Sequence, residues 1–186
     1  ESLQSGCDAT LARMNRKYTT EEYENACSIL RKNFTHPAIT TDVIVGFPGE
    51  TEEEFAQTKE YLKRIHFYEM HIFKYSKRAG TRAAVMSHQV PDPVKTTRSA
   101  ELLAMEKEQS KQFRTHYVGR EAEVLLEETK EIGGTEYLLG HTRDYVKLAV
   151  SVKENKKNVA NTVICGRVQG FLTDEILLLS PLEFSK

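Results

Sequence analysis

The 186-residue sequence lacks an excess of charge of either sign and any long apolar run. Its formal net charge is −1, so charge alone does not indicate binding to nucleic acid or to a membrane surface. No stretch approaches the roughly 18 consecutive apolar residues of a membrane-spanning helix, and the opening residues do not have the pattern of a signal peptide. We therefore expect a cytoplasmic protein with no membrane partner.

The sequence is also poor in cysteine. Cys7, Cys27 and Cys165 are an odd and scattered set, which suits a reducing compartment and argues against a disulfide framework. No two of them have metal-ligand spacing, so we expect no structural zinc and no iron–sulfur cluster held by this chain. Cys27 falls on an apolar helix face and is expected to be a core residue.

Residues 40–51, with the sequence TTDVIVGFPGET, have the pattern of a strand, a glycine-rich loop and a helix start. The β-branched run at 43–45 is typical of a strand covered on both faces. Gly46 and the Pro-Gly pair that follows end the strand and let the backbone approach a ligand closely. Thr51 and Glu54 form a capping box at the helix start. Such a corner is a common ligand site in α/β folds.

Asp42 leads this apolar strand, where a carboxylate requires a partner. Two interpretations are open. Asp42 binds a hydroxyl or ammonium group of a cofactor, or it lies exposed at the strand end or pairs with a neighbouring arginine. The local pattern favours neither.

The first part of the chain alternates strands and helices. We expect a helix at about 8–17, with Asp8 as the cap, and a second helix that follows a capping box at Thr19 and Glu22. Two further helices are expected at about 52–65 and 94–116, and a strand at about 68–75. This rhythm predicts parallel strands with crossover helices and a ligand site at the C-terminal strand ends. Gln4, the loop at 46–50 and the basic loop at 75–81 should therefore share one rim.

Near Tyr117 the composition changes to glycine pairs and short alternating runs. We expect strands at about 121–128, 135–139, 144–152, 161–171 and 176–179, with breaks at Gly133-Gly134 and Gly140-His141. Five short strands predict a small closed barrel of the oligonucleotide-binding kind. The predicted fold class is α/β followed by all-β, with domains at 1–116 and 117–186.

The second domain is not basic, since it holds nine Lys or Arg against eleven Asp or Glu. Binding to nucleic acid would therefore rest on a local patch. Strand alternation would place Tyr145 and Lys147 on one face, an aromatic ring beside a cation. The alternative is a solvated strand face and a charged hairpin. The candidates for the patch are Arg143, Tyr145, Lys147, Lys153, Lys156, Lys157 and Arg167.

Four blocks, in order, resemble the C-terminal half of the radical S-adenosylmethionine (SAM) (β/α) partial barrel of methylthiotransferases that modify adenosine in tRNA anticodon loops. They are LQSGCD at 3–8, MNRKYT at 14–19, DVIVGFPGET at 42–51 and YSKRAGT at 75–81. The segment GHTRDYVK at 140–147 resembles the TRAM domain, the five-stranded β-barrel that ends those enzymes. The opening block is most like the branch that acts on N6-threonylcarbamoyladenosine.

The resemblance implies which residues bind SAM. Gln4 would contact the ribose, Asp42 the ribose hydroxyls or the ammonium group, and Arg16 the carboxylate of SAM, as their side-chain chemistry allows. The residues that would lie against the adenine are Val45, Gly46 and Phe47.

The resemblance also implies the contacts with substrate, and it makes tRNA the partner. Arg78 and Thr81 would face the substrate or SAM. In the second domain Arg143, Tyr145 and Lys147 would contact RNA. The reaction would be methylthiolation of C2 of a hypermodified adenosine.

The sequence departs from the family in its cysteines. The family uses a Cys-x3-Cys-x2-Cys loop for the SAM-cleaving [4Fe–4S] cluster and three N-terminal cysteines for a second cluster, and this sequence has neither set. We therefore expect a C-terminal piece of such an enzyme, with SAM and two [4Fe–4S] clusters belonging to the complete protein. We expect this piece to hold none of them, to contain no catalytic residue and to be inactive by itself.

One further expectation follows from a truncated barrel. The sheet edge near Leu3, Gln4 and 38–45 should be covered by another copy of the chain through edge-strand self-association, by the chain's own helix, or by disorder. Two other functions stay open. One is a stand-alone RNA-binding module without catalytic activity, and the other is an α/β domain whose regulatory barrel binds no nucleic acid.

Overall fold

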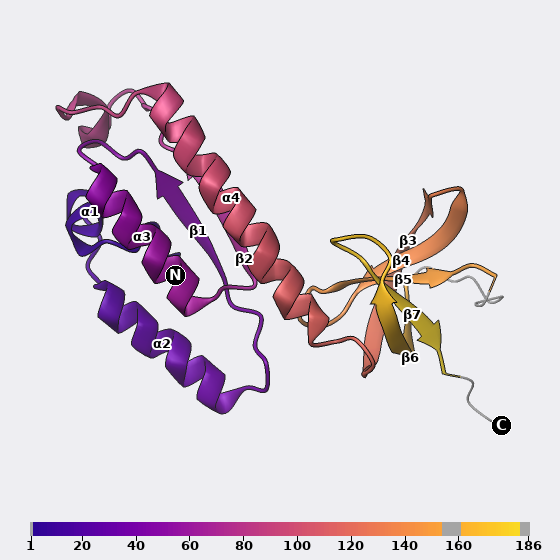
Figure 1. The fold of residues 1–186 in the computed structure, drawn as a ribbon. Helices are drawn as coiled ribbons and strands as arrows, with labels where there is room; N and C mark the ends of the chain where they lie inside the picture. Colours follow the sequence, from indigo (N-terminus) through magenta and orange to yellow (C-terminus); the bar gives the residue numbers. More distant parts are fainter. Residues whose placement is uncertain (1, 154–160, 183–186) are drawn as a thin grey trace. The chain divides into compact units, whose positions relative to one another are not determined.

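The computed structural model describes residues 2–153 and 161–182, so the predicted patch residues Lys156 and Lys157 lie outside it. The chain divides into two compact units, residues 1–110 and 111–186 (Figure 1). The division falls within helix α4 (Asp92–Thr115), slightly before the limit between residues 116 and 117 that the sequence suggests. No helix in the described ranges is both long and apolar enough to cross a membrane.

The first unit has an α/β fold, in which helices pack on a sheet of two parallel strands. Its elements are α1 (Asp8–Arg13), α2 (Thr20–Asn33), β1 (Thr40–Val45), α3 (Glu52–Ile65), β2 (Glu69–Lys74), a 3-10 helix (Arg82–Val85) and most of α4 (Asp92–Thr115). Strand β1 pairs in parallel with β2, and a single parallel bridge joins Gln4 to Val43 on its other side. The parallel arrangement is as predicted.

Local sequence signals explain where these helices begin. Both predicted capping boxes are present, at Thr19 before α2 and at Thr51 before α3. The predicted cap at Asp8 is wrong. Its carboxylate instead accepts the backbone N–H of Thr20 at 2.7 Å. Helix α1 ends at Arg13 rather than near residue 17, because Asn15 takes a left-handed conformation with φ of 61°.

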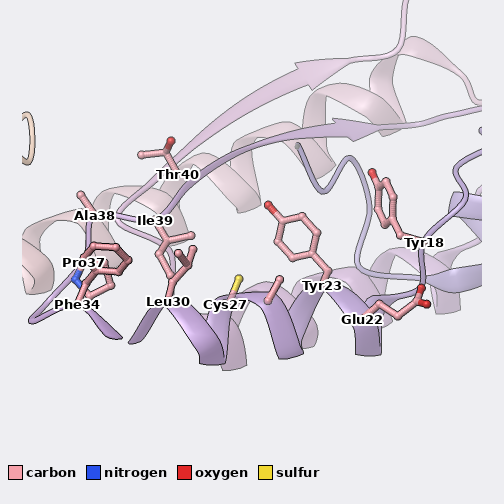
Figure 2. A pocket seen from close by; sticks show the side chains of 11 residues that line it. Tyr18, Glu22, Tyr23, Cys27, Leu30, Phe34, Pro37, Ala38, Ile39 and Thr40 are labelled. Atoms are coloured by element: carbon pink, nitrogen blue, oxygen red, sulfur yellow. The ribbon is translucent and has the colours of Figure 1, made fainter. Parts of the chain in front are cut away.

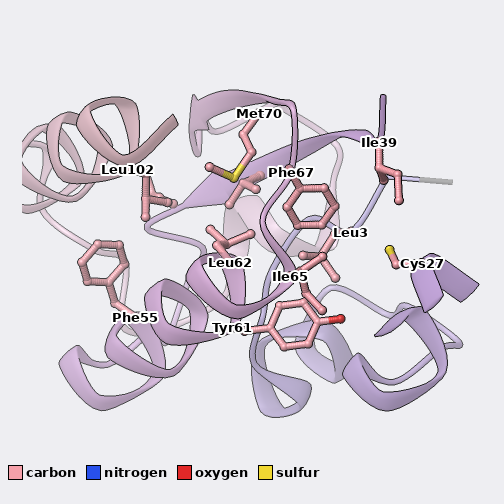
Figure 3. Close-up of a cluster of buried hydrophobic side chains, with 12 residues drawn as sticks. Leu3, Cys27, Ile39, Phe55, Tyr61, Leu62, Ile65, Phe67, Met70 and Leu102 are labelled. Carbon is pink, nitrogen blue, oxygen red and sulfur yellow. The ribbon is translucent and has the colours of Figure 1, made fainter. Parts of the chain in front are cut away.

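The core of the first unit lies between the helices and one face of the sheet (Figure 3). Val43 and Val45 of β1 are buried there, and Cys27 is buried too, as predicted. The prediction of two covered faces for β1 is wrong, because Asp42 and Ile44 on the opposite face are only half-buried. The other core side chains are Leu3, Ile39, Phe55, Tyr61, Leu62, Ile65, Phe67, Met70 and Leu102.

The second unit contains the predicted closed barrel of five strands. The strands are β3 (Glu121–Ile132), β4 (Thr135–His141), β5 (Lys147–Ser151), β6 (Thr162–Phe171) and β7 (Leu177–Pro181), in the order β3-β4-β5-β7-β6. Neighbouring strands are antiparallel, except that β5 and β7 are parallel. The fold class is therefore α/β followed by an all-β barrel, as expected of a TRAM-like domain.

Two local predictions in the barrel are wrong. Tyr145 does not share a strand face with Lys147, because β5 begins only at Lys147 and Tyr145 lies in the preceding turn with φ of 60°. Gly140 and His141 do not break a strand but end β4. A Cβ atom at Gly140 would lie 1.9 Å from the carbonyl oxygen of Leu125, so this strand position admits only glycine.

Candidate functional site

The C-terminal ends of β1 and β2 meet at a pocket of about 550 Å³. Parallel pairing continues past the strands, since the N–H of Tyr75 donates to the carbonyl of Val45 at 2.9 Å. The rings of Phe47 and Tyr75 meet edge-on, with their centroids 5.3 Å apart. The two loops that the sequence placed on one rim therefore do meet. The lining residues are Ile44, Phe47, Phe73, Lys74, Tyr75, Ser76, Arg78, Thr81 and Ala83.

Asp42 lies on the open face of the sheet, below this rim. Its carboxylate accepts a hydrogen bond from the Ser2 hydroxyl at 2.6 Å and lies 3.1 Å from Nδ1 of His71. These two contacts, that of Ser2 foremost, hold the pKa of the Asp42 carboxyl below its ordinary value. The carboxylate is ionised at neutral pH and partly open to solvent, with 38% of its side chain exposed. Arg16 is exposed and does not pair with Asp42.

Gln4 and Val45 are placed differently from Asp42. Gln4 is buried, with φ of 70°, and its main chain bonds both to the carbonyl of Asp42 and to the N–H of Ile44, each at 2.9 Å. Val45 turns its side chain into the core, where it is 1% exposed. Only the backbone of Val45 faces the rim. Any contact of Val45 with a ligand would therefore be made through the main chain.

The loop after β1 is fixed from below by a buried ion pair. Oε1 of Glu50 accepts the N–H of Gly46 at 3.0 Å and a hydrogen bond from Arg98 at 2.6 Å. Burial raises the pKa of the Glu50 carboxyl, while Gly46 and Arg98 act in the opposite direction. Gly46 has φ of 72°, and a Cβ atom there would lie 2.4 Å from Cγ of Lys95. Sequence reasoning missed Glu50 and Arg98, since no local signal links residues 48 positions apart.

The second loop of the rim carries Arg78 and Thr81. The Thr81 hydroxyl donates to the carbonyl of Arg78 at 2.8 Å and accepts the N–H of Ala84 at 3.3 Å, so it shapes the turn into the 3-10 helix. The guanidinium of Arg78 is exposed beside the pocket. The Tyr75 hydroxyl is buried without a hydrogen-bond partner among the described residues. A buried donor of this kind is unfavourable by itself and suits a ligand that completes it.

A second hollow, of about 620 Å³, lies between α2 and the beginning of β1 (Figure 2). Tyr23, Leu30, Phe34 and Ile39 give it a mostly apolar lining. Leu30 is 41% exposed, so the helix face that the sequence marks as apolar is only half-covered. The hollow adjoins residues 38–40, part of the sheet edge that the sequence expects to be covered.

On the barrel, the predicted RNA-contacting cations pair with glutamates of β3. Arg143 lies 3.4 Å from Glu123, and Lys147 lies 3.4 Å from Glu128. Arg167 makes a similar contact with Glu121, and Lys153 is exposed. These cations therefore do not form an uncompensated positive patch. Tyr145, which is 77% exposed, stands beside them.

The residues of the described ranges contain no group of three His, Cys, Asp or Glu side chains placed to hold a metal ion. Cys7 and Cys27 are buried in the first unit, and Cys165 lies in the barrel. Burial raises the pKa of the Cys27 thiol, which makes it a poor metal ligand. An iron–sulfur cluster does not fit these residues.

Comparison of the sequence with known proteins shows which family and which relatives this chain resembles. Residues 2–62 match the model of the Radical SAM superfamily. The chain is 41% identical, over 82% of its length, to the threonylcarbamoyladenosine tRNA methylthiotransferase MtaB of Bacillus subtilis. It is 45% identical, over 67% and 69% of its length, to the tRNA-2-methylthio-N(6)-dimethylallyladenosine synthases of Acetivibrio thermocellus and Aquifex aeolicus. The chain spans 34%, 26% and 29% of these three relatives, respectively.

Proposed function

Since the chain belongs to the radical SAM methylthiotransferases of tRNA, we propose that it forms part of an enzyme that methylthiolates C2 of a hypermodified adenosine in the anticodon loop. The first unit contributes part of the SAM and substrate pocket, and the TRAM-like barrel binds the tRNA. The reaction takes place in the cytoplasm. The observation that carries this proposal is the similarity to tRNA methylthiotransferases over most of the chain.

We further assign the substrate to N6-threonylcarbamoyladenosine. The similarity to the threonylcarbamoyladenosine enzyme covers 82% of the chain, against 67% and 77% for the dimethylallyladenosine enzymes of Acetivibrio thermocellus and Desulfitobacterium hafniense. The opening LQSGCD block also favours this branch. The exposed guanidinium of Arg78 offers a partner for the carboxylate of the threonylcarbamoyl group.

The residues at the rim fit a SAM-like ligand. Asp42 is an ionised acceptor for an ammonium or hydroxyl group, and Phe47 gives the pocket an apolar wall after Gly46, whose own free side is filled by Lys95. The buried hydroxyl of Tyr75 can donate to a ligand oxygen or nitrogen. Arg16 is available for a carboxylate, because it is exposed and does not pair with Asp42. SAM, together with iron–sulfur clusters held by other parts of the complete enzyme, would supply the radical chemistry.

The test of the RNA part is tRNA binding by this chain at increasing salt. Phosphate contacts release counterions, so the logarithm of the affinity should fall linearly with the logarithm of salt concentration. Replacing Arg143 and Lys147 together by alanine should weaken binding and flatten the slope by roughly one unit for each phosphate that is no longer neutralised. Lys130→Ala, an exposed cation elsewhere on β3, should leave the slope unchanged. Binding that does not respond to salt, or no binding, would contradict the proposal.

A further inference from the structure

The outer face of the barrel carries a further, smaller pocket, of about 300 Å³. Its floor is apolar and crosses three strands, because Leu125 of β3 pairs with Val163 of β6 on one side and with His141 of β4 on the other. Leu125 and Val163 are 42% and 63% exposed, so both present apolar surface to solvent. The lining residues are Glu123, Leu125, Glu127, His141, Thr142, Arg143, Tyr145 and Val163.

Tyr145 stands at the side of this floor in a strained but well-fixed conformation. Its φ of 60° is unusual for an aromatic residue, and the residue is 77% exposed, so folding gains little from it. The turn is nevertheless held firmly, since Thr142 accepts the N–H groups of Tyr145 and Val146, each at 3.1 Å. The hydroxyl of Tyr117 also donates to Asp144 at 2.6 Å. The turn therefore presents a preorganised aromatic ring.

Carboxylates rather than cations dominate the rim of this pocket. Glu127 accepts from His141 at 2.6 Å, which engages one of its oxygens closely. Glu123 lies 3.4 Å from Arg143, whose side chain is 90% exposed, and 53% of the Glu123 side chain is itself exposed. Two carboxylates repel phosphate, so the pocket suits the uncharged part of a nucleotide. The oxygens of Glu123 can accept hydrogen bonds from such a group.

We propose that this pocket binds one unstacked guanine base of RNA, with its face on Tyr145 and its Watson–Crick edge on Glu123. Guanine is the base that presents two neighbouring donors, N1–H and the 2-amino group, to a single carboxylate. Unpaired bases in RNA are commonly stacked on aromatic side chains and read along this edge. The inference rests on the proposed tRNA-binding function of the barrel and adds a base preference to it.

The test compares two short, single-stranded, uridine-rich oligoribonucleotides that differ at one central position, guanosine in one and inosine in the other. Inosine lacks the 2-amino group and is otherwise the same. The 186-residue chain should bind the guanosine oligonucleotide about tenfold more tightly, within the range of one bidentate base contact. Glu123→Gln should remove this preference, while Glu131→Gln, an exposed position on the same strand outside the pocket, should preserve it.

Tyr145→Leu should weaken binding of both oligonucleotides by about tenfold, because the same stacking interaction is removed from each. Equal affinity of the unmodified chain for guanosine and inosine, with salt-dependent binding intact, would overturn the guanine site and leave the tRNA function standing. A guanosine preference that persists in Glu123→Gln would also overturn it. If the chain binds neither the oligonucleotides nor tRNA at low salt, both proposals fail.

Discussion

Asp42 illustrates what a single residue contributes to the candidate SAM site. The sequence left open a ligand, an exposed strand end and a pair with arginine. The structure gives it Ser2 and His71 as partners rather than an arginine, on the open face of the sheet. These partners keep the carboxylate ionised without covering it. A charge held in this way is suited to an incoming cation or hydroxyl.

Asp42→Asn should therefore impair SAM binding more than folding. The change keeps the volume and an acceptor for the Ser2 hydroxyl but removes the charge. Losing a charged hydrogen-bond partner costs roughly 1.5–3 kcal/mol, or about ten- to a hundredfold in SAM affinity. Arg16→Ala should act in the same range if it holds the SAM carboxylate. The measurement is SAM affinity and melting temperature on the same samples of the complete enzyme that the proposed function implies.

Glu60→Gln, an exposed carboxylate on α3, serves as the matched control and should change neither quantity. Normal SAM affinity together with a lowered melting temperature in Asp42→Asn would show that Asp42 is structural.

At the scale of elements, α1 and α3 are joined by a charge pair that no local pattern predicts. The guanidinium of Arg13 contacts both carboxylate oxygens of Glu54, which also accepts the N–H of Thr51. Hydrogen bonding to Arg13, first of all, lowers the pKa of Glu54 below its usual value of about 4.5. Glu54 thus serves in the capping box and in helix packing at once.

Because the folded-state pKa of Glu54 is lowered, its contribution to stability is present above about pH 4.5 and is lost as pH falls through the folded-state pKa. Glu54→Gln should lower the free energy of unfolding of the chain by about 1–2 kcal/mol at neutral pH. The loss should shrink toward zero in acid. Urea unfolding of both proteins at neutral and at acidic pH checks this, with Glu60→Gln as the control. A loss that stays constant with pH would contradict the electrostatic explanation.

Elements with strong local signals were predictable, and those fixed by distant contacts were not. The capping boxes at Thr19 and Thr51 placed α2 and α3, because their hydrogen bonds join residues three positions apart. Gly140 gave the opposite result. It reads as a break in the sequence, but it is a strand position where the backbone of Leu125 leaves no room for a side chain. Only the tertiary structure reveals such a close approach of two strand backbones.

At the scale of the whole molecule, the order of elements predicted the fold class of both units. Alternating helix and strand signals gave the parallel α/β unit, and five short strands gave the closed barrel. The site was predictable only in part. The sequence predicted that the loops at 46–50 and 75–81 lie on one rim. It did not predict the ion pair of Glu50 and Arg98, which joins α4 to a loop far away in sequence. The turn of Tyr145 depends on where β5 begins, which alternation did not fix.

The barrel closes through one short seam. Strands β5 and β7 are joined by two residue pairs, whereas β3 and β4 are joined by seven. In native-state hydrogen exchange, opening should therefore occur first at this seam, so the amides of β5 and β7 that face it, rather than those bonded to β4 or β6, should exchange fastest among the barrel strands. Opening there converts the barrel into an open sheet in the order β7-β6-β3-β4-β5. The pocket floor formed by β6, β3 and β4 lies at the centre of that sheet. The proposed base-binding surface would therefore stay formed when the barrel opens between β5 and β7.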